Sequence, residues 1–143
     1  MSTFRTLSES VLASPQIGPE DVLAAKEQGV TLIVNNRPDG EEPGAPQGDE
    51  IAAAAAAEGI DYIAIPIGQS GYSAPQVEQM ISALESASGK VLAYCRSGTR
   101  STFLWSLAQA KAGAAPDEIA AAAAAAGYDI SPIRPMIDML ASR

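Results

Sequence analysis

Apolar and polar positions are grouped along this chain in blocks that predict strands and helices in turn. Two nearly continuous apolar runs, residues 30–35 and 90–95, are typical of central strands in a parallel sheet, which are covered on both faces. Residues 60–66 alternate and end at a proline, which predicts a third strand. Residues 4–12 fit a short edge strand or an extended lead-in.

The segments between these strands have helical patterns with start signals. Pro19 opens a helix that should run to about residue 28, and Ser73 caps another helix that begins at residue 74. The chain as a whole, residues 1–143, is expected to form one α/β domain of three layers. Its centre would be a mostly parallel sheet of about four strands with helices on both faces. Further helices are expected over residues 49–58, 102–111, 117–126 and 131–143.

Composition and charge narrow the function classes. A net charge of −8 disfavours nucleic acid as a partner. The absence of histidine from the sequence excludes histidine-based metal sites and Ser-His or Cys-His catalysis, and we expect neither a metal nor a cofactor. The single cysteine, Cys95, excludes an internal disulfide and suits a reducing compartment. Because no stretch resembles a secretory signal or a membrane span, we expect a cytoplasmic protein without membrane contact.

The segment 90–101 contains the residues with the most distinctive chemistry. Its strand ends at Cys95, a short polar loop with Gly98 follows, and a helix comes next. In a strand, loop and helix N-terminus of this kind, successive backbone N–H groups point into a small bowl. Cys95 would lie at the bottom of the bowl, where the helix dipole and the guanidinium groups of Arg96 and Arg100 favour the thiolate over the thiol.

The alternative is that Cys95 is an ordinary buried side chain without reactivity. Two arginines on a buried turn argue against this, because their charges need an anion nearby. Gly98 permits a tight turn, and Ser101 could cap the helix or donate a hydrogen bond to a thiolate. We therefore predict that Cys95 and Arg100 are catalytic. The anion-binding loop is predicted to include Arg96, Ser97, Gly98, Thr99 and Ser101.

A second loop, residues 36–48, is rich in proline, glycine and acidic residues. Loops of this composition usually lie on the solvated surface. This one follows the carboxyl end of a predicted strand, where open α/β sheets bind ligands, so it could instead overhang the Cys95 loop. Both interpretations stay open for its acidic residues Asp39, Glu41 and Glu42.

Residues 94–101 (Tyr-Cys-Arg-Ser-Gly-Thr-Arg-Ser) resemble the active loop of single-domain rhodaneses, which are sulfurtransferases. They are also similar to the Cys-(x)5-Arg-Ser/Thr signature of cysteine-dependent phosphatases, but the spacing here is Cys-(x)4-Arg. The wider chain, from about Phe4 to Gly113 and including residues 33–44, resembles a bacterial family of phosphatase-like domains (DUF442). Members of that family also occur fused to metallo-β-lactamase-type hydrolases, and they are often described as sulfurtransferases.

This resemblance implies a cysteine-phosphatase-like fold and a small anionic substrate, namely thiosulfate, a persulfide or a phosphate ester. It also implies that Arg37 braces the catalytic loop, with Asp39 as a second supporting residue. A metallo-β-lactamase-type hydrolase is the macromolecular partner that the resemblance suggests.

Two chemistries fit a loop of this kind. In a sulfurtransferase, Cys95 would take up a sulfane sulfur and hold it as a persulfide, which requires no strong general acid. In a phosphatase, Cys95 would form a phosphocysteine while a carboxylic acid protonates the leaving oxygen. We predict a sulfurtransferase, with a phosphatase as the alternative and a domain that only binds an anion or a partner as the third hypothesis.

Three departures from related phosphatases favour sulfur transfer. The loop is one residue shorter, and Tyr94 replaces the histidine that phosphatases place before their cysteine. The segment Gly68-Gln69-Ser70 stands where an aspartate is common in the dual-specificity phosphatases. An acid on the other loop, Asp39, Glu41 or Glu42, could still serve as the proton donor.

Overall fold

The structure is a computed structural model that describes residues 4–68 and 70–142, so Gln69 of the predicted acid-free segment lies outside the described residues. The strands of this part are β1 (Arg5–Thr6), β2 (Val11–Ser14), β3 (Val30–Asn35), β4 (Asp61–Ala64) and β5 (Lys90–Tyr94). The helices are α1 (Pro19–Glu27), α2 (Gly48–Ala57), α3 (Ala74–Ser86), α4 (Thr99–Lys111), α5 (Pro116–Ala125), the 3-10 turn η1 (Ser131–Ile133) and α6 (Arg134–Ala141).

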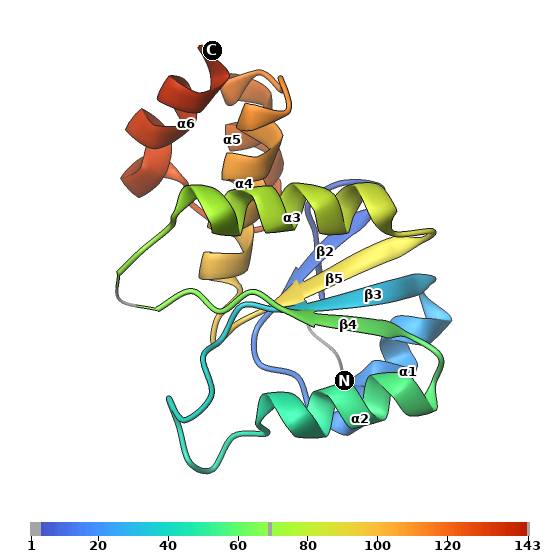
Figure 1. Ribbon diagram of the computed structural model, residues 1–143. Helices are drawn as coiled ribbons and strands as arrows, with labels where there is room; N and C mark the ends of the chain where they lie inside the picture. Colours follow the sequence, from blue (N-terminus) through green and yellow to red (C-terminus); the bar gives the residue numbers. More distant parts are fainter. Residues whose placement is uncertain (1–3, 69, 143) are drawn as a thin grey trace.

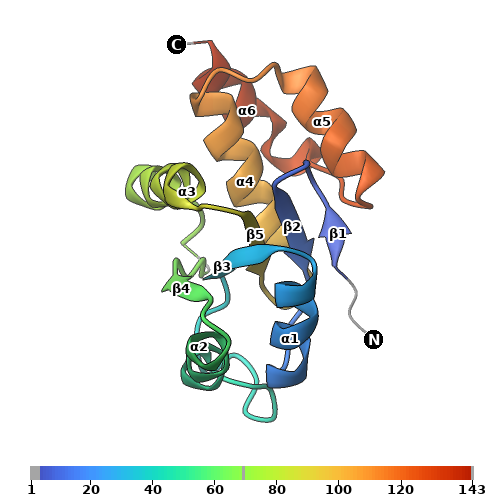
Figure 2. The same cartoon turned by 90° about the vertical axis from the view of Figure 1, so that its right-hand side faces the viewer.

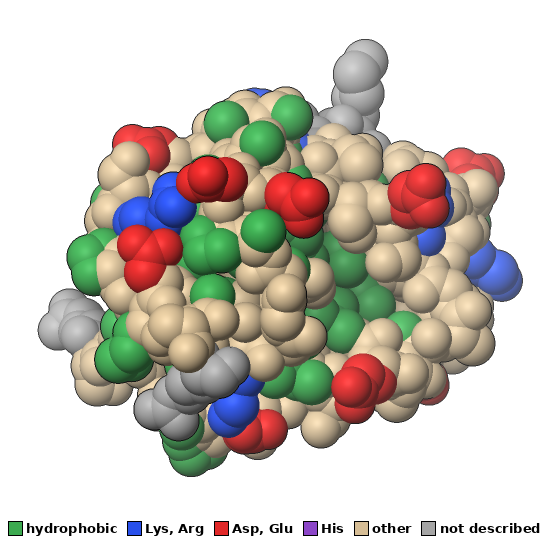
Figure 3. Space-filling view, turned by 90° about the horizontal axis from the view of Figure 1, so that it is seen from above, with side chains coloured by type: hydrophobic (Ala, Val, Ile, Leu, Met, Phe, Trp, Pro, Cys, Tyr) green, Lys and Arg blue, Asp and Glu red, His purple; other side chains and the backbone are tan. Residues whose placement is uncertain are grey.

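The strands form one sheet in the order β1-β2-β5-β3-β4, in which only β1 is antiparallel to its neighbour among the described strands. Helices α1 and α2 cover one face, and α3 and α4 cover the other, with α5 and α6 packed outside α4 (Figures 1 and 2). The predicted α/β class with helices on both faces of a mostly parallel sheet is therefore confirmed. Seen from the side of α5 and α6, the surface mixes apolar side chains with charged ones of both signs (Figure 3).

Alternation along the buried strands divides the core into two layers. In β3, the side chains of Leu32 and Val34 belong to the cluster under α3 and α4, whereas Ile33 belongs to the cluster under α1 and α2. In β5, Ala93 belongs to the cluster under α3 and α4, and Leu92 belongs to the cluster under α1 and α2. Burial on both faces explains why these strands read as continuous apolar runs.

Helix α4 is the most deeply buried helix of the fold. It packs against the sheet on one side and against α3, α5 and α6 on the others. Two of its inward hydroxyls bond within the helix: Thr102 Oγ1 donates to the Gly98 carbonyl at 2.9 Å and Ser106 Oγ donates to the Thr102 carbonyl at 2.8 Å. These two bonds add to the packing of the N-terminal half of the helix, the part that begins at the Cys95 loop.

Two predicted elements differ from the structure. Residues 4–12 are not one edge strand, because a turn at Ser8 reverses the chain between β1 and the fully buried β2. The sheet has five described strands, one more than the approximate number predicted, because this segment contributes two of them. Helix α4 begins at Thr99 instead of residue 102, which places Arg100 and Ser101 in its first turn. Ser101 is therefore not the cap, a position that Gly98 holds.

In the described ranges, none of the helices is both long and apolar enough to cross a membrane. The same ranges contain no group of three or more acidic, cysteine or histidine side chains suited to hold a metal ion.

Candidate active site

Cys95 lies immediately after β5, at the carboxyl edge of the sheet and between two neighbouring strands. Its N–H donates to the Ser14 carbonyl at the end of β2 at 3.3 Å. On the other side, the Asn36 N–H donates to the Tyr94 carbonyl at 2.8 Å. The side chain of Cys95 is fully buried, with 0% of its surface exposed. The ends of three parallel strands therefore fix the position of the thiol.

Gly98 closes the short loop between Cys95 and α4. Its N–H donates to Cys95 Sγ at 3.1 Å, and its carbonyl accepts the first N–H bond of the helix, from Thr102, at 2.9 Å. The φ of Gly98 is +92°, in the left-handed region that favours glycine. A Cβ at this position would lie 2.1 Å from Tyr128 Oη, so the loop requires glycine here for space as well as for backbone conformation.

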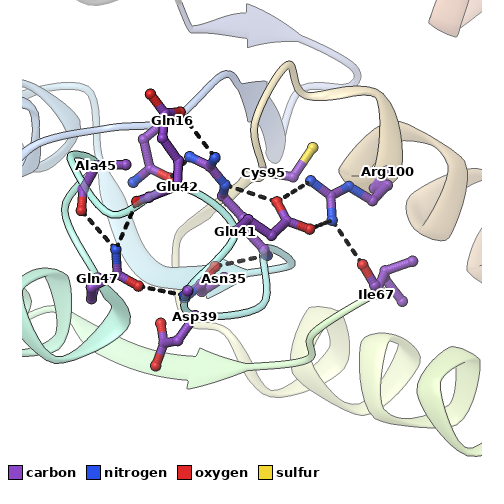
Figure 4. A network of polar contacts seen from close by, with 12 residues as sticks. Gln16, Asn35, Asp39, Glu41, Glu42, Ala45, Gln47, Ile67, Cys95 and Arg100 are labelled. Carbon is purple, nitrogen blue, oxygen red and sulfur yellow. Dashed lines mark hydrogen bonds and ion pairs between the residues drawn. The ribbon is translucent and has the colours of Figure 1, made fainter. Parts of the chain in front are cut away.

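Arg100 extends from the first turn of α4 toward the second loop and grips the carboxylate of Glu41 (Figure 4). Its two terminal nitrogens donate to the two oxygens of Glu41 at 2.7 and 2.9 Å. Nη1 also donates to the Ile67 carbonyl at 2.8 Å. In this structure, the Glu41 carboxylate is thus the anion bound by the Arg100 guanidinium, close to Cys95.

Arg37 is buried beneath the same loop and makes contacts with three side chains. It donates to Glu41 at 2.9 Å, to Glu42 at 3.2 Å and to Gln16 Oε1 at 2.9 Å. The backbone N–H of Gln16 in turn donates to the Arg96 carbonyl at 3.2 Å. The contacts of Arg37 thus reach the Cys95 loop through Gln16, and reach Arg100 through Glu41, rather than directly.

The remaining predicted loop residues lie in different environments. Arg96 is exposed and lines a cleft of about 530 Å³ together with Arg37, Glu41, Glu42 and Arg100. Ser97 Oγ is exposed and donates to Thr99 Oγ1 at 2.9 Å. Ser101 is fully buried, and its hydroxyl has no hydrogen-bond partner among the described atoms. This cleft therefore combines three arginines with two glutamates, of which Glu41 and Glu42 are paired with Arg37 and Glu41 also with Arg100.

The acidic candidates are all engaged in contacts. Asp39 Oδ1 accepts the N–H of Gly48, the first residue of α2, at 2.9 Å, and this side chain lies away from Cys95 (Figure 4). The hydrogen bond from Arg100, followed by that from Arg37, lowers the pKa of Glu41 to about 2. Glu41 is therefore ionised at neutral pH and cannot donate a proton in this arrangement.

Two residues near Cys95 were not predicted from the sequence. Tyr72 is half-buried, its ring packs against Phe103 with centroids 6.3 Å apart, and burial with the nearby Cys95 raises its pKa to about 12. Gln16 lies two residues after the end of β2, at the carboxyl edge of the sheet. The sequence pattern did not show where β2 ends, so it gave no reason to place Gln16 there. Tyr72 follows the predicted strand 60–66 by only a few residues, but no motif marks it.

The ion pairs of Glu41 predict a pH dependence of stability. The folded-state pKa of Glu41 is about 2, below its ordinary value of 4.5, so ionised Glu41 stabilises the fold fully above pH 4.5 and loses this effect as the pH falls toward 2. Glu41→Gln should lower the free energy of unfolding by about 1 kcal/mol at pH 7, the range for partly exposed pairs. Denaturant titrations at several pH values should show this difference shrinking below pH 4.5, whereas Glu85→Gln, at an exposed position of α3, should show no such trend.

The fold and the buried cysteine loop define a class of protein, the α/β proteins with a phosphatase-like fold. The model of one family, described as "Beta-lactamase hydrolase-like protein, phosphatase-like domain", matches residues 3–112. The chain belongs to this family. A beta-lactamase hydrolase-like protein of Xylella fastidiosa (strain Temecula1) is 31% identical over 125 residues, which cover 87% of this chain but 29% of the relative. The chain thus spans less than a third of that relative's length.

Solved structures support the same class. A candidate phosphatase from Neisseria meningitidis Z2491 is 30% identical, with a TM-score of 0.86 over 98% of this chain and 99% of that one. PTPMT1 in complex with PI(5)P is similar in fold, with a TM-score of 0.71, 10% identity and coverage of 98% and 97%. TpbA of P. aeruginosa in complex with pTyr has a TM-score of 0.61, 15% identity and coverage of 95% and 90%.

Proposed function

We propose that the chain is a cysteine-dependent phosphatase that acts on small phosphate esters, with Cys95 as the nucleophile. The observation that carries this proposal is the grip of Arg100 on the Glu41 carboxylate at 2.7 and 2.9 Å, close to Cys95. A guanidinium that binds two oxygens of a carboxylate has the fork geometry that also binds two oxygens of a phosphoryl group. Membership of a phosphatase-like family, and the phosphate compounds bound to PTPMT1 and TpbA, support the same assignment.

In the proposed reaction, the Cys95 thiolate attacks phosphorus, the S–P bond forms and the P–O bond to the leaving group breaks. Water then attacks phosphorus, which releases phosphate and returns the thiolate. Arg100 would stabilise the negative charge of the transferred phosphoryl group, and the Gly98 N–H would stabilise that of the Cys95 thiolate. The N-terminus of α4 would favour both charges. Asp39 and Glu41 are engaged and are not available as proton donors to the leaving group, so aryl phosphates, which leave as phenolates, are the preferred substrate class.

A substrate must displace Glu41 before it can reach this position. Cys95 is fully buried, and Glu41 already occupies the two donors of Arg100. The phosphoryl group of a substrate would replace this carboxylate on Arg100, and the loop 36–48 would move aside with it. Glu41 is thus expected to weaken substrate binding.

Removal of the Glu41 charge should therefore strengthen the binding of anions. In Glu41→Gln, the KM for an aryl phosphate and the inhibition constant of inorganic phosphate should both fall about two- to fivefold, the scale of a partly exposed ion pair. The matched control is Glu42→Gln, which loses a contact with Arg37 but none with Arg100. Equal constants in the parent and in Glu41→Gln would show that Glu41 does not overlap the substrate.

Sulfur transfer remains the second candidate, favoured by two specific observations. Asp39 and Glu41, two of the three acids proposed as proton donors, are bound to Gly48 and to arginines, and the loop has the short Cys-(x)4-Arg spacing. In sulfur transfer, the Cys95 thiolate would attack the sulfane sulfur of thiosulfate, the new S–S bond would form and sulfite would leave with the bonding electron pair. No proton donor is needed for that step.

The experiment that separates these candidates measures both reactions on one preparation. Release of phenolate from an aryl phosphate reports phosphatase chemistry, and intact mass after thiosulfate or glutathione persulfide reports a persulfide at Cys95. The proposal requires phosphate turnover that is lost in Cys95→Ser. A persulfide without phosphate turnover would reverse the ranking. If neither reaction is observed, the hypothesis of a domain that only binds an anion or a partner is left.

Two predictions from the sequence belong to this proposal. A metallo-β-lactamase-type hydrolase stays a predicted partner, and this prediction rests on the sequence resemblance alone. A cytoplasmic location is likewise still a prediction, and it rests on the sequence.

A further inference from the structure

One peptide group of the Cys95 loop is held by hydrogen bonds on both sides. The N–H of the peptide between Ser97 and Gly98 donates to Cys95 Sγ at 3.1 Å. The carbonyl of the same peptide, that of Ser97, accepts the hydroxyl of Tyr128 at 3.1 Å. Because a peptide group is planar, the hydroxyl that fixes the carbonyl also fixes the direction of the N–H.

The loop itself supplies little to hold this peptide in place. Gly98 has a φ of +92°, and glycine populates positive and negative φ about equally. Rotation of the peptide would turn the Ser97 carbonyl toward Sγ and remove the backbone N–H that donates to the sulfur. The Tyr128 hydroxyl opposes this rotation through its hydrogen bond to the carbonyl. It also packs so close to Gly98 that a Cβ on residue 98 would lie 2.1 Å from its oxygen.

Tyr128 is itself fixed from two directions. Its N–H donates to the Ala123 carbonyl at 2.9 Å, which ties it to the end of α5. The guanidinium of Arg5 lies over its ring, 5.9 Å from the centroid, and donates to the Ala126 carbonyl at 3.1 Å. Burial raises the pKa of Tyr128, so the hydroxyl keeps the proton that it donates.

We propose that Tyr128 is a positioning residue for the nucleophile. Its hydroxyl holds the Ser97–Gly98 peptide with the N–H directed at Cys95 Sγ, and polarisation of the carbonyl strengthens that N–H as a donor to the thiolate. The inference rests on the proposed function only in taking Cys95 as the nucleophile. It holds for phosphoryl transfer and for sulfur transfer alike.

The test is Tyr128→Phe, which removes the hydroxyl and keeps the ring. Alkylation of Cys95 by iodoacetamide, followed over a range of pH, should reach half of its maximal rate at a higher pH than in the parent. The rate at neutral pH should fall about three- to tenfold, the scale of one neutral hydrogen bond. For aryl phosphate turnover, kcat should fall by a similar factor and KM should change less.

Two controls separate positioning from general stability. Arg5→Met removes the cation over the ring but retains the hydroxyl, so its alkylation profile should shift less than that of Tyr128→Phe, even if its melting temperature falls as far. Tyr62→Phe removes a hydroxyl that accepts from Asn35 on the opposite side of the sheet, and it should also follow the parent. The melting temperature of Tyr128→Phe, compared with that of Arg5→Met, shows whether lost stability alone explains an effect.

An unchanged alkylation profile in Tyr128→Phe would overturn the inference, whatever its turnover. An equal shift in Arg5→Met would also overturn it, because the hydroxyl would then have no special part. If the parent protein shows no phosphate turnover but Tyr128→Phe still shifts the alkylation profile, the proposed function fails and the role of Tyr128 stands.

Discussion

Replacement of Cys95 by serine should lower turnover at least about 10³-fold, because a serine hydroxyl needs a base to become a nucleophile. The chain contains no histidine, and the acids nearest the loop are engaged with arginines and with Gly48. The fold should survive the change, because the smaller oxygen can still accept the Gly98 N–H.

Three measurements check this result. Release of phenolate and of inorganic phosphate should fall to background, and no mass should be added after thiosulfate. Inorganic phosphate should still bind, measured by calorimetry, because Arg100 is intact. Residual turnover close to that of the parent would point to a nucleophile other than Cys95 and would remove the basis of the proposed function.

Arg100→Lys should produce the second largest loss, a fall in kcat/KM of about 10²- to 10³-fold for an aryl phosphate. An ammonium group cannot reproduce the two parallel bonds that Arg100 makes to the oxygens of Glu41 at 2.7 and 2.9 Å. Nor can it maintain these bonds together with the one to the Ile67 carbonyl. Because the transferred phosphoryl group presents the same paired oxygens, lysine would hold it in a less defined orientation.

The matched control is Arg96→Lys in the same cleft. Arg96 is exposed and has the same charge, so this change should alter kcat/KM only a few-fold. Circular dichroism and melting temperature should confirm that both variants are folded. If Arg100→Lys loses no more activity than Arg96→Lys, charge alone, rather than the fork of Arg100, binds the substrate.

Some parts of this fold could be predicted because each had a strong local signal. The apolar runs at residues 30–35 and 90–95 are strands buried on both faces, and the Ser73 cap is present with its reciprocal partner Gln76. The start of α4 was misplaced because Thr99, Arg100 and Ser101 are polar. In the structure, Arg100 contacts Glu41 and Ser101 is buried in the core. The local sequence pattern shows neither contact.

The site was predictable in its centre and not at its edges. Cys95 and Arg100 stand in one short motif, so their proximity follows from sequence spacing alone. Gln16 and Tyr128 reach the same loop from distant positions through single hydrogen bonds, which leave no pattern in the sequence. The engagement of Glu41 by Arg100, 59 positions away, is likewise visible only in three dimensions.

The balance between the two chemistries also changed. The short loop and the missing aspartate favoured sulfur transfer on sequence grounds. The family and the solved structures are phosphatase-like, and the cleft of three arginines around Glu41 suits a phosphoryl group at least as well. Phosphatase chemistry is therefore placed first, and sulfur transfer is retained as the reaction that the same assay must exclude.

The packing of α5 and α6 around α4 has a consequence for where this domain can be cut. The family match ends at residue 112, so a shorter protein made to that boundary would retain Cys95, Arg37 and Arg100. It would lose Tyr128 and would expose Leu104 and other core side chains of α4 that share a cluster with α5 and α6. We expect such a truncated protein to aggregate or to lack activity. The smallest piece suitable for expression or for fusion to another enzyme should therefore extend to the end of α6.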